Sequence, residues 1–347
     1  MNKPLLTVAI PTYNRPETLQ KTLEALKVEN SDSFIVLVSD DSSTDGVEEV
    51  VRSHQKVMPN LCYNKNLANL GFSGNVCHLY ELATTRYIWF LCDDDAVYPG
   101  AIAIIIQALE RYEPVVAIFN CTWGDSFGRQ LVAGASEDRI YAESTTFVRY
   151  DVLMRLTFLS IIVVEKRLPI ELIKSNPAYK DNVFFQLTLG LYLLSDKFKL
   201  CEVASTIVHR NVGYKYGEFF KFMLIDALKA IYLIPHKFDN RNFIRWSIRN
   251  LPSALQLYLS QKIGLFCYTG TPTRSTLKKL MHYYGPYAIG ILFFRAACAA
   301  IPAPLIRAIY LLKLFSLHGF KGGIAVYRRL VDRAKTDTRK TGFTAYR

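Results

Sequence analysis

The stretch Leu5-Leu6-Thr7-Val8-Ala9-Ile10-Pro11-Thr12-Tyr13-Asn14-Arg15-Pro16 passes from an apolar run directly into a polar loop. Residues 5–10 predict a buried strand that ends where the polar side chains begin. Leu19, Leu23 and Leu26 follow at the spacing of one helix face, which predicts an amphipathic helix. The start of the chain therefore predicts a strand, a polar loop and a helix in succession.

The same succession occurs a second time within the first 57 residues. Residues 34–39 predict a second strand, residues 40–46 (Asp-Asp-Ser-Ser-Thr-Asp-Gly) a polar loop, and residues 47–57 a second helix. Repeated units of this kind predict βαβ crossovers and a parallel sheet, so the expected fold class is α/β.

Three consecutive carboxylates follow a third apolar run. Residues 86–91 predict a buried strand, and Asp93-Asp94-Asp95 come after it, separated from it by Cys92. Adjacent carboxylates repel one another unless a cation or a set of donors compensates them. Hard oxygen ligands suit Mg²⁺ or Mn²⁺, which proteins commonly hold together with the phosphates of a substrate. The run predicts a metal-assisted site for a nucleotide diphosphate, and a solvated acidic turn is the alternative.

The three polar clusters, at residues 11–15, 40–46 and 93–95, all follow predicted strands. Ligands of parallel α/β sheets bind beyond the carboxyl ends of the strands. We therefore expect the three clusters to meet at one edge of the sheet.

Four motifs carry a resemblance to a known family. Pro11-Thr12-Tyr13-Asn14-Arg15, residues 40–46, Asn69-Leu70-Gly71-Phe72-Ser73-Gly74-Asn75, and the three aspartates with Pro99 behind them resemble, in order and spacing, the inverting family 2 glycosyltransferases. The resemblance covers residues 1 to about 215. It implies the GT-A fold, a mostly parallel sheet with helices on both faces, and transfer of a sugar from a nucleotide diphosphate sugar donor with inversion. Within that family the chain looks most like bacterial enzymes of O-antigen, lipopolysaccharide or other surface polysaccharide synthesis, including abequosyltransferase-like members.

The resemblance also implies which residues receive the nucleotide donor. Asp41 matches the carboxylate that accepts a hydrogen bond from the base. Gly71 would let the backbone approach the nucleotide, although an ordinary loop glycine remains the alternative. For Asp40 and Asp45 a local role at the start of the next helix is preferred to ligand contact. The full set of expected donor-binding residues is Pro11, Thr12, Tyr13, Arg15, Asp41, Asn69, Gly71, Asp93 and Asp94.

The same resemblance implies Asp94 and Asp95 as ligands of the divalent cation, Mn²⁺ or Mg²⁺. Cys92 stands where most family members carry the first aspartate of the motif. A thiol is softer than such a cation prefers, so Cys92 is interpreted as a packing residue.

An inverting transfer needs a base that takes the proton of the acceptor hydroxyl. The matching stretch is residues 179–186, where Lys180 replaces the usual Glu and Asp181 is the expected base. A carboxylate favoured by a helix N-terminus is compatible with that role. Glu165 and Glu171 are the next candidates.

Two further stretches complete the expected site. His209 and Arg210 match basic residues that approach the diphosphate, with an exposed basic pair as the alternative. Trp123, Asp125 and Arg129 fall in the variable region that builds the acceptor pocket in the family, and nothing in their spacing identifies the acceptor sugar.

Charge divides the chain into two parts. Residues 1–209 hold 19 basic and 25 acidic residues, a net charge of −6, whereas residues 210–347 hold 23 basic and 5 acidic residues, a net charge of +18. We expect a catalytic domain at 1–215 and a basic, mainly helical region at 216–347. The latter has an apolar stretch from Tyr287 to Phe315 that charged and proline residues interrupt.

That stretch is too broken for a typical spanning helix, and a re-entrant or tilted segment is the alternative. Apolar helices carrying Lys and Arg instead predict a position on an anionic membrane surface, and a helical subdomain packed on the catalytic domain is the alternative. No zinc spacing, recognition-helix pattern or aromatic RNA-binding motif accompanies the charge, which argues against nucleic acid as a partner.

The seven cysteines form no Cys-x-x-Cys pair, which predicts a reducing compartment. The first strand begins at once and leaves no room for a signal peptide. These features predict a cytoplasmic enzyme, peripheral on the inner face of the plasma membrane, where a lipid-linked oligosaccharide acceptor would be reached.

Two other functions stay open at the level of sequence. One is a catalytically inactive scaffold that keeps the GT-A fold and recruits partners to the membrane. The other is a sugar nucleotidyltransferase on a related fold, which would predict a glycine-rich phosphate loop after the first strand, and residues 11–14 do not form one.

Overall fold

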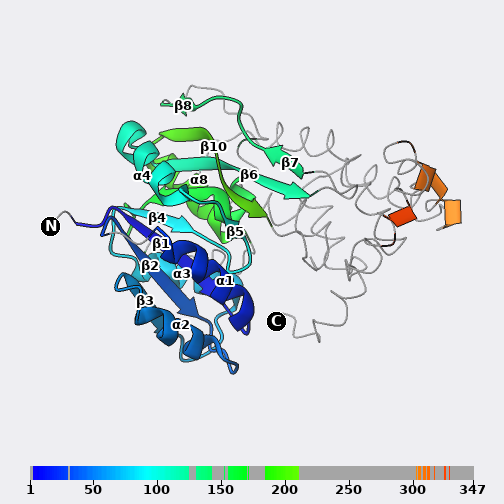
Figure 1. Cartoon of the computed structure of the whole chain (residues 1–347). Helices are drawn as coiled ribbons and strands as arrows, with labels where there is room; N and C mark the ends of the chain where they lie inside the picture. The colour runs from blue at the N-terminus through cyan, green and yellow to red at the C-terminus, as the bar shows by residue number, and fades with distance from the viewer. Residues whose placement is uncertain are drawn as a thin grey trace, which may run out of the picture.

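One mixed sheet organises the part of the chain that the structure describes. The computed structural model describes residues 3–29, 32–124, 130–142, 155–169 and 184–210, single positions at 152 and 171, and scattered positions between 302 and 328. Ten strands form the sheet, in the order β3-β2-β1-β4-β9-β6-β10-β5, with β7 beside β6 and β8 beside β10 (Figure 1).

The predicted parallel units form the first half of this sheet. The elements are β1 (Leu6–Thr12), α1 (Pro16–Lys27), β2 (Phe34–Asp40), α2 (Val47–Gln55), β3 (Leu61–Lys65), α3 (Gly71–Leu82) and β4 (Tyr87–Phe90). All pairings among β1, β2, β3 and β4 are parallel, as expected. Leu19, Leu23 and Leu26 are fully buried, which confirms the predicted apolar face of α1.

The direction of the crossovers places helices on both faces of the sheet. From β1 to β3 the chain moves steadily outward, and α3 then carries it back across β2 and β1 to β4. Because such crossovers are right-handed, reversing the direction of travel puts α3 on the face opposite α1 and α2. The contacts agree, since α1 packs against α2 and α3 packs against α8 (Phe185–Asp196).

The second half of the sheet is mixed. Its elements are β5 (Ala96–Val97), α4 (Ala101–Tyr112), β6 (Val116–Gly124), β7 (Gln130–Ala133), β8 (Arg139–Tyr141), the short 3₁₀ helices η1 (Arg155–Thr157) and η2 (Leu159–Ile161), β9 (Ile162–Glu165) and β10 (Leu200–Arg210). β9 runs antiparallel to both β4 and β6, whereas β6 and β10 are parallel. The expected α/β fold with a mostly parallel sheet is thus confirmed, although β5, β7, β8 and β9 run in the opposite direction.

Strand β1 is longer than the predicted 5–10. It continues through Pro11 and Thr12, which pair with Ser39 and Asp40 of β2. Pairing with β4 on the other side stops at Ala9 and Phe90. A proline removes a ladder donor and is tolerated where a neighbouring strand has ended. The polar residues of the first loop consequently start on the sheet itself.

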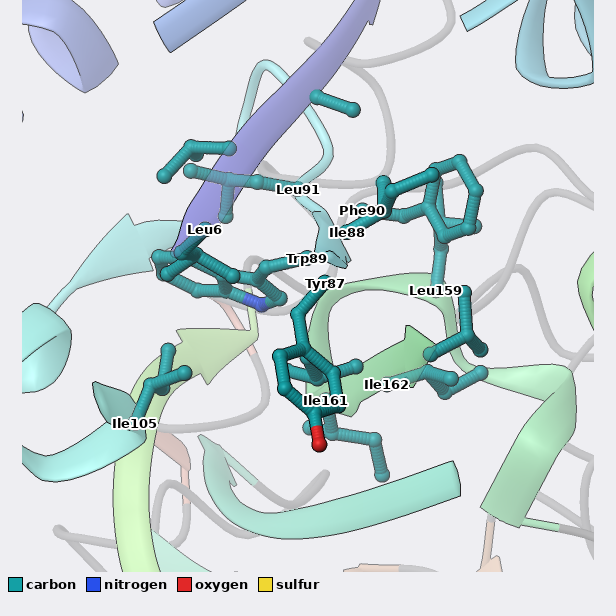
Figure 2. Packing of buried hydrophobic residues seen from close by; sticks show 14 of the residues in the cluster. Leu6, Tyr87, Ile88, Trp89, Phe90, Leu91, Ile105, Leu159, Ile161 and Ile162 are labelled. Atoms are coloured by element: carbon teal, nitrogen blue, oxygen red, sulfur yellow. The ribbon is translucent and has the colours of Figure 1, made fainter. Parts of the chain in front are cut away.

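The core is centred on β4. Tyr87, Ile88, Trp89 and Phe90 are all at most 1% exposed, and Figure 2 shows them among Leu6, Leu159, Ile161 and Ile162. Burying one large apolar side chain contributes about 1.5–3 kcal/mol. This packing fixes the strand whose end carries the three aspartates.

Two expectations concern parts of the chain that are described only in part. Within the described residues, no helix has the length and apolar character needed to cross a membrane. Most of residues 211–347, including the predicted boundary near 215, lies outside the described residues.

The described cysteines, at 62, 77, 92, 121 and 201, are free thiols.

Candidate functional site

The carboxyl ends of β1 and β4 meet at the point where the direction of the chain across the sheet reverses. Such a switch point is where open α/β sheets bind their ligands. Thr12 Oγ1 donates a hydrogen bond to Asp93 Oδ2 at 2.8 Å. Arg15 Nη1 lies 3.2 Å from Asp93 Oδ1 and 3.0 Å from Asp94 Oδ2. The first and third polar clusters are therefore in direct contact, as the sequence predicts.

The three aspartates form a crowded, partly compensated group. Burial, followed by the charge of Asp93, raises the pKa of Asp94 to about 8, against the opposing charge of Arg15. Burial also raises the pKa of Asp93, against Arg15 and Thr12, which favour its carboxylate. Within the part of the chain that the structure describes, Arg15 offsets part of the negative charge of Asp93 and Asp94.

The donor set fits a hard divalent cation. Ligand atoms of Cys92, Asp94 and Asp95 lie within 4.8 Å of one another. Asp94 Oδ1 is buried with no hydrogen-bond partner among the described residues. Burial and the neighbouring carboxylates raise the pKa of the Cys92 thiol well above its usual value, which disfavours the thiolate that binds metals. Asp94 and Asp95 are the groups suited to hold Mg²⁺ or Mn²⁺.

Sequence reasoning missed Ser160, which comes from η2. Ser160 is fully buried, and its Oγ donates to Asp95 Oδ2 at 2.5 Å and accepts from the Cys92 N–H at 3.0 Å. Its carbonyl accepts from Trp89 Nε1 at 2.9 Å. Ser160 thereby ties the aspartate loop to the core. Its only signal in the sequence is a single hydroxyl within the apolar run 158–164.

Asp41 lies at the carboxyl end of β2 and is fully buried. Its Oδ1 accepts hydrogen bonds from the Leu70 N–H at 2.7 Å and from Asn66 Nδ2 at 3.0 Å. Its Oδ2 is buried without a hydrogen-bond partner among the described residues. One unsatisfied carboxylate oxygen in this position suits the predicted contact with a donor N–H of a base.

The other two aspartates of this loop have local roles. Asp40 accepts from the Ser43 N–H at 2.8 Å and from the Tyr63 hydroxyl at 2.7 Å, as a loop-forming residue would. Asp45 stands one position before Gly46, which is the N-cap of α2, and no side chain caps that helix. Burial raises the pKa of Asp45, although the Val47 N–H at the start of the helix favours its carboxylate. Asp45 therefore acts on the start of α2 through the Val47 N–H, as predicted, although the N-cap residue itself is Gly46.

The first two polar loops are tied together through Asn14. Asn14 has a φ of 51°, a conformation that Asn tolerates better than most residues. Its N–H donates to Ser43 Oγ at 2.9 Å, and its Oδ1 accepts from the Thr44 N–H at 3.0 Å. These bonds fix the backbone on which the half-buried Tyr13 is carried.

Gly71 begins α3 with a φ of +72°, a region that L side chains rarely adopt. Asn69 Oδ1 accepts from the Gly71 N–H at 3.0 Å, so the Asn69 side chain shapes this turn. Apart from its two neighbours in the chain, no described residue has a heavy atom within 4 Å of the position that a Cβ of residue 71 would occupy. The glycine is therefore required by backbone conformation, and the open space beside it leaves room for a ligand.

Gly71→Ala is expected to lower the free energy of unfolding by about 1 kcal/mol, because the cost comes from the left-handed backbone alone. Chemical denaturation of the purified protein measures the change. Gly46→Ala is the matched control, since Gly46 has a φ of −69° and its nearest neighbours lie 3.9 Å away. An equal loss in both variants would contradict this explanation.

β10 brings His209 beside the aspartate loop. His209 pairs with Ala96, the residue after Asp95, across the β10 and β5 ladder. Its Nδ1 lies 2.8 Å from Thr122 Oγ1, which lies 2.7 Å from the Tyr98 hydroxyl. The Arg210 guanidinium lies 5.1 Å from the centre of the Phe158 ring. The predicted basic pair is thus at the correct edge of the sheet.

The candidates for the catalytic base differ in where they lie. Asp181 and Lys180 lie outside the described residues, as do Asp125 and Arg129. Glu165 pairs with Tyr87 at the start of β4, the end of the strand away from the aspartates, and it binds Arg86 at 3.0 Å and Arg167 at 3.4 Å. Glu165 is therefore at the wrong end of the sheet to act as the base. Glu171 is an exposed helical position.

The first part of the chain resembles known proteins in sequence. Residues 7–155 match the family model described as glycosyl transferase family 2. The GalNAc(5)-diNAcBac-PP-undecaprenol beta-1,3-glucosyltransferase of Campylobacter jejuni is 33% identical over 121 residues, which cover 34% of this chain and 38% of that protein. Abequosyltransferase RfbV of Salmonella typhimurium is 33% identical over 113 residues, which cover 30% of this chain and 33% of that protein. The match therefore spans little more than a third of these relatives.

Among solved structures, S. aureus TarS superimposes with a TM-score of 0.57 at 13% identity, over 96% of this chain and 91% of that chain. TarS has also been solved in complex with UDP and with UDP-GlcNAc. At this identity the likeness concerns the fold alone, and it supports the expected GT-A fold.

Proposed function

We propose that this protein, whose residues 7–155 match the model of glycosyl transferase family 2, transfers one sugar from a nucleotide diphosphate donor to an acceptor hydroxyl with inversion at the anomeric carbon. The observation that carries the proposal is the contact of Thr12 and Arg15 with the buried aspartates at the switch point of the sheet. This arrangement places the Arg15 guanidinium, which would pair with the phosphates of the donor, beside carboxylates that suit a metal ion.

The donor would lie across the loops at the carboxyl ends of β1, β2 and β4. Asp41 Oδ2 would accept from a ring N–H of the base, and Pro11, Thr12, Tyr13, Asn69 and Gly71 would surround the nucleoside. The complexes of TarS with UDP and UDP-GlcNAc support a nucleotide diphosphate as the ligand class. Arg15 and Asp93 would meet the ribose and diphosphate side of the donor.

In the transfer, the acceptor oxygen forms a bond to the anomeric carbon while the bond from that carbon to the diphosphate oxygen breaks. Asp94 and Asp95 would hold a divalent cation, Mn²⁺ or Mg²⁺, which when bound neutralises charge on the departing diphosphate. Ser160 keeps Asp95 oriented through its 2.5 Å hydrogen bond. Arg15 and His209 would add donors on the diphosphate side.

The proton of the acceptor hydroxyl would pass to Asp181. A carboxylate positioned within hydrogen-bond reach is sufficient for this step. The resemblance of residues 179–186 to the corresponding family stretch supports the assignment. Attack from the side opposite the leaving diphosphate gives inversion in a single displacement.

We propose a lipid-linked oligosaccharide as the acceptor, in the synthesis of a bacterial surface polysaccharide such as O-antigen. The name of the Campylobacter jejuni relative contains an oligosaccharide on PP-undecaprenol, and RfbV is an abequosyltransferase. Such an acceptor implies action at the inner face of the plasma membrane, with residues 216–347 as the membrane-associated region.

An exposed apolar stripe in the C-terminal region supports that association. Leu305, Ile309 and Leu312 are helical positions spaced for one face, and they are 52%, 59% and 67% exposed. The surrounding part of the chain has the net charge of +18. Apolar side chains on a basic helical region suit an anionic lipid surface.

Full-length protein is expected to sediment with vesicles that contain anionic lipid, and added salt should weaken the association because exposed charges are screened. Replacing Leu305, Ile309 and Leu312 together by Ser should lower vesicle affinity by about tenfold or more. The control replaces Val28 and Val57, exposed apolar residues of the catalytic domain, by Ser. Unchanged sedimentation of the triple variant would show that the stripe does not enter the membrane.

The proposed function is tested by incubating purified full-length protein with a panel of nucleotide sugars and Mn²⁺. A true donor raises the melting temperature by mass action and is hydrolysed slowly, with release of nucleoside diphosphate. A scaffold without turnover would bind but release nothing. A nucleotidyltransferase would instead consume a nucleoside triphosphate and a sugar phosphate, with release of pyrophosphate.

A further inference from the structure

A connected set of buried polar side chains lies beneath Asp41. Ser39 of β2, Asn66 after β3 and Asn75 of α3 are 0%, 7% and 2% exposed. Buried amides are costly unless their hydrogen bonds are made, so such a set persists only when its members satisfy one another. The direction of each hydrogen bond in this set can be assigned.

The assignment of donors and acceptors starts at a backbone carbonyl group. The Ser39 carbonyl oxygen can only accept, and Asn75 Nδ2 donates to it at 2.9 Å. Asn75 Oδ1 must therefore face the other members of the set. It accepts from Ser39 Oγ at 2.6 Å and from Asn66 Nδ2 at 3.1 Å.

The amide of Asn66 is consequently fixed on both sides. Its Oδ1 accepts from Asn64 Nδ2 at 2.8 Å, and its Nδ2 also donates to Asp41 Oδ1 at 3.0 Å. The Leu70 N–H donates to the same Asp41 oxygen at 2.7 Å. Both donors are thus on Oδ1, and Oδ2 is the buried oxygen that has no partner in the described part of the chain.

We infer that Asn66 is a positioning residue for selection of the nucleobase of the donor. It holds the Asp41 carboxylate so that only Oδ2 is left for that nucleobase. The inference rests on the proposed function, since it concerns the same donor site. A single fixed oxygen accepts from a ring N–H, as in uracil or guanine, and meets a lone pair at the corresponding nitrogen of cytosine or adenine. A carboxylate free to turn could also accept from the exocyclic amino group of cytosine or adenine, which would reduce the discrimination.

Binding of two matched pairs, UDP with CDP and GDP with ADP, tests this in full-length protein with Mn²⁺ by titration calorimetry. Each pair keeps the ring system of the base and changes the hydrogen on the ring nitrogen together with the exocyclic group beside it, and guanine also carries a 2-amino group. The wild-type protein is expected to prefer the N–H member of one pair by about tenfold or more, and Asn66→Ala should reduce that ratio about tenfold. Absolute affinity alone is not the readout, since a merely structural role would lower both members equally.

Two further variants keep the test decisive if Asn66→Ala folds poorly. Asn66→Leu keeps most of the side-chain volume and places no second carboxylate beside Asp41. It removes the donor to Asp41, so it should lose discrimination without leaving the cavity that Asn66→Ala leaves. Asn60→Ala is the control, because Asn60 donates to the Phe34 carbonyl at the opposite end of β2. Asn60→Ala should leave the ratio unchanged.

A wild-type ratio retained in both folded Asn66 variants would overturn the inference. An equal loss of affinity for both members of a pair would also overturn it and assign Asn66 a structural role. Wild-type protein that transfers sugar yet binds both members of each nucleotide pair equally would overturn this inference and leave the proposed function standing. Wild-type protein that binds no nucleotide diphosphate would overturn the proposed function and this inference together.

Discussion

Chelation of divalent cations with EDTA is expected to abolish sugar transfer, and Mn²⁺ or Mg²⁺ should restore it. Asp94 and Asp95 have their ligand atoms within 4.8 Å of each other and of Cys92, and Asp94 Oδ1 is a buried oxygen with no hydrogen-bond partner among the described residues. Loss of the cation leaves the departing diphosphate without its main compensating charge, which costs several kcal/mol in the transition state. Transfer assays on dialysed protein measure this effect.

Asp95→Asn tests the same site without a chelator. Transfer should fall by about a hundredfold or more and donor binding should weaken, because a neutral amide is a poorer ligand for a hard cation. Asp45→Asn is the matched control, since Asp45 is exposed in the neighbouring loop and contacts none of the three aspartates in the described hydrogen bonds. Full activity in EDTA, or of Asp95→Asn, would show that the aspartates hold no catalytic metal.

Asp181→Asn is expected to lower transfer by about a hundredfold or more, the range typical of a positioned general base. The substitution nearly preserves shape but removes the group that accepts the proton of the acceptor hydroxyl. Donor binding should persist, because the residues proposed to bind the donor lie at the ends of β1, β2 and β4. Single-turnover transfer and nucleotide titration together separate the two effects.

Asp196→Asn provides the control for Asp181. Asp196 ends α8 and pairs with Arg167 at 3.1 Å, on a side chain that is 47% exposed. Its replacement should leave transfer unchanged, since exposed ion pairs contribute little. If Asp181→Asn turned over normally, the base would lie elsewhere, and Glu171 would be tested next because Glu165 is at the opposite end of β4.

The sequence by itself predicted the first two strand–loop–helix units, the strand before the three aspartates and the edge of the sheet where the site lies. Apolar runs followed by polar loops and by residues such as Leu19 and Leu23 are local patterns that predict βαβ units. Parallel pairing of these strands then brings their carboxyl ends to one edge of the sheet. Contact between Arg15 and the aspartates 78 and 79 residues away followed from that rule.

Only the tertiary structure decided which side chains support the site. Ser160 reaches Asp95 from 65 positions along the chain, and the network of Ser39, Asn66 and Asn75 orients Asp41 across a strand, a loop and a helix. It also put β9 antiparallel to β4, which removed Glu165 from the catalytic edge. Periodicity reports the face on which a residue lies, but a hydrogen bond between distant segments depends on packing that no local pattern encodes.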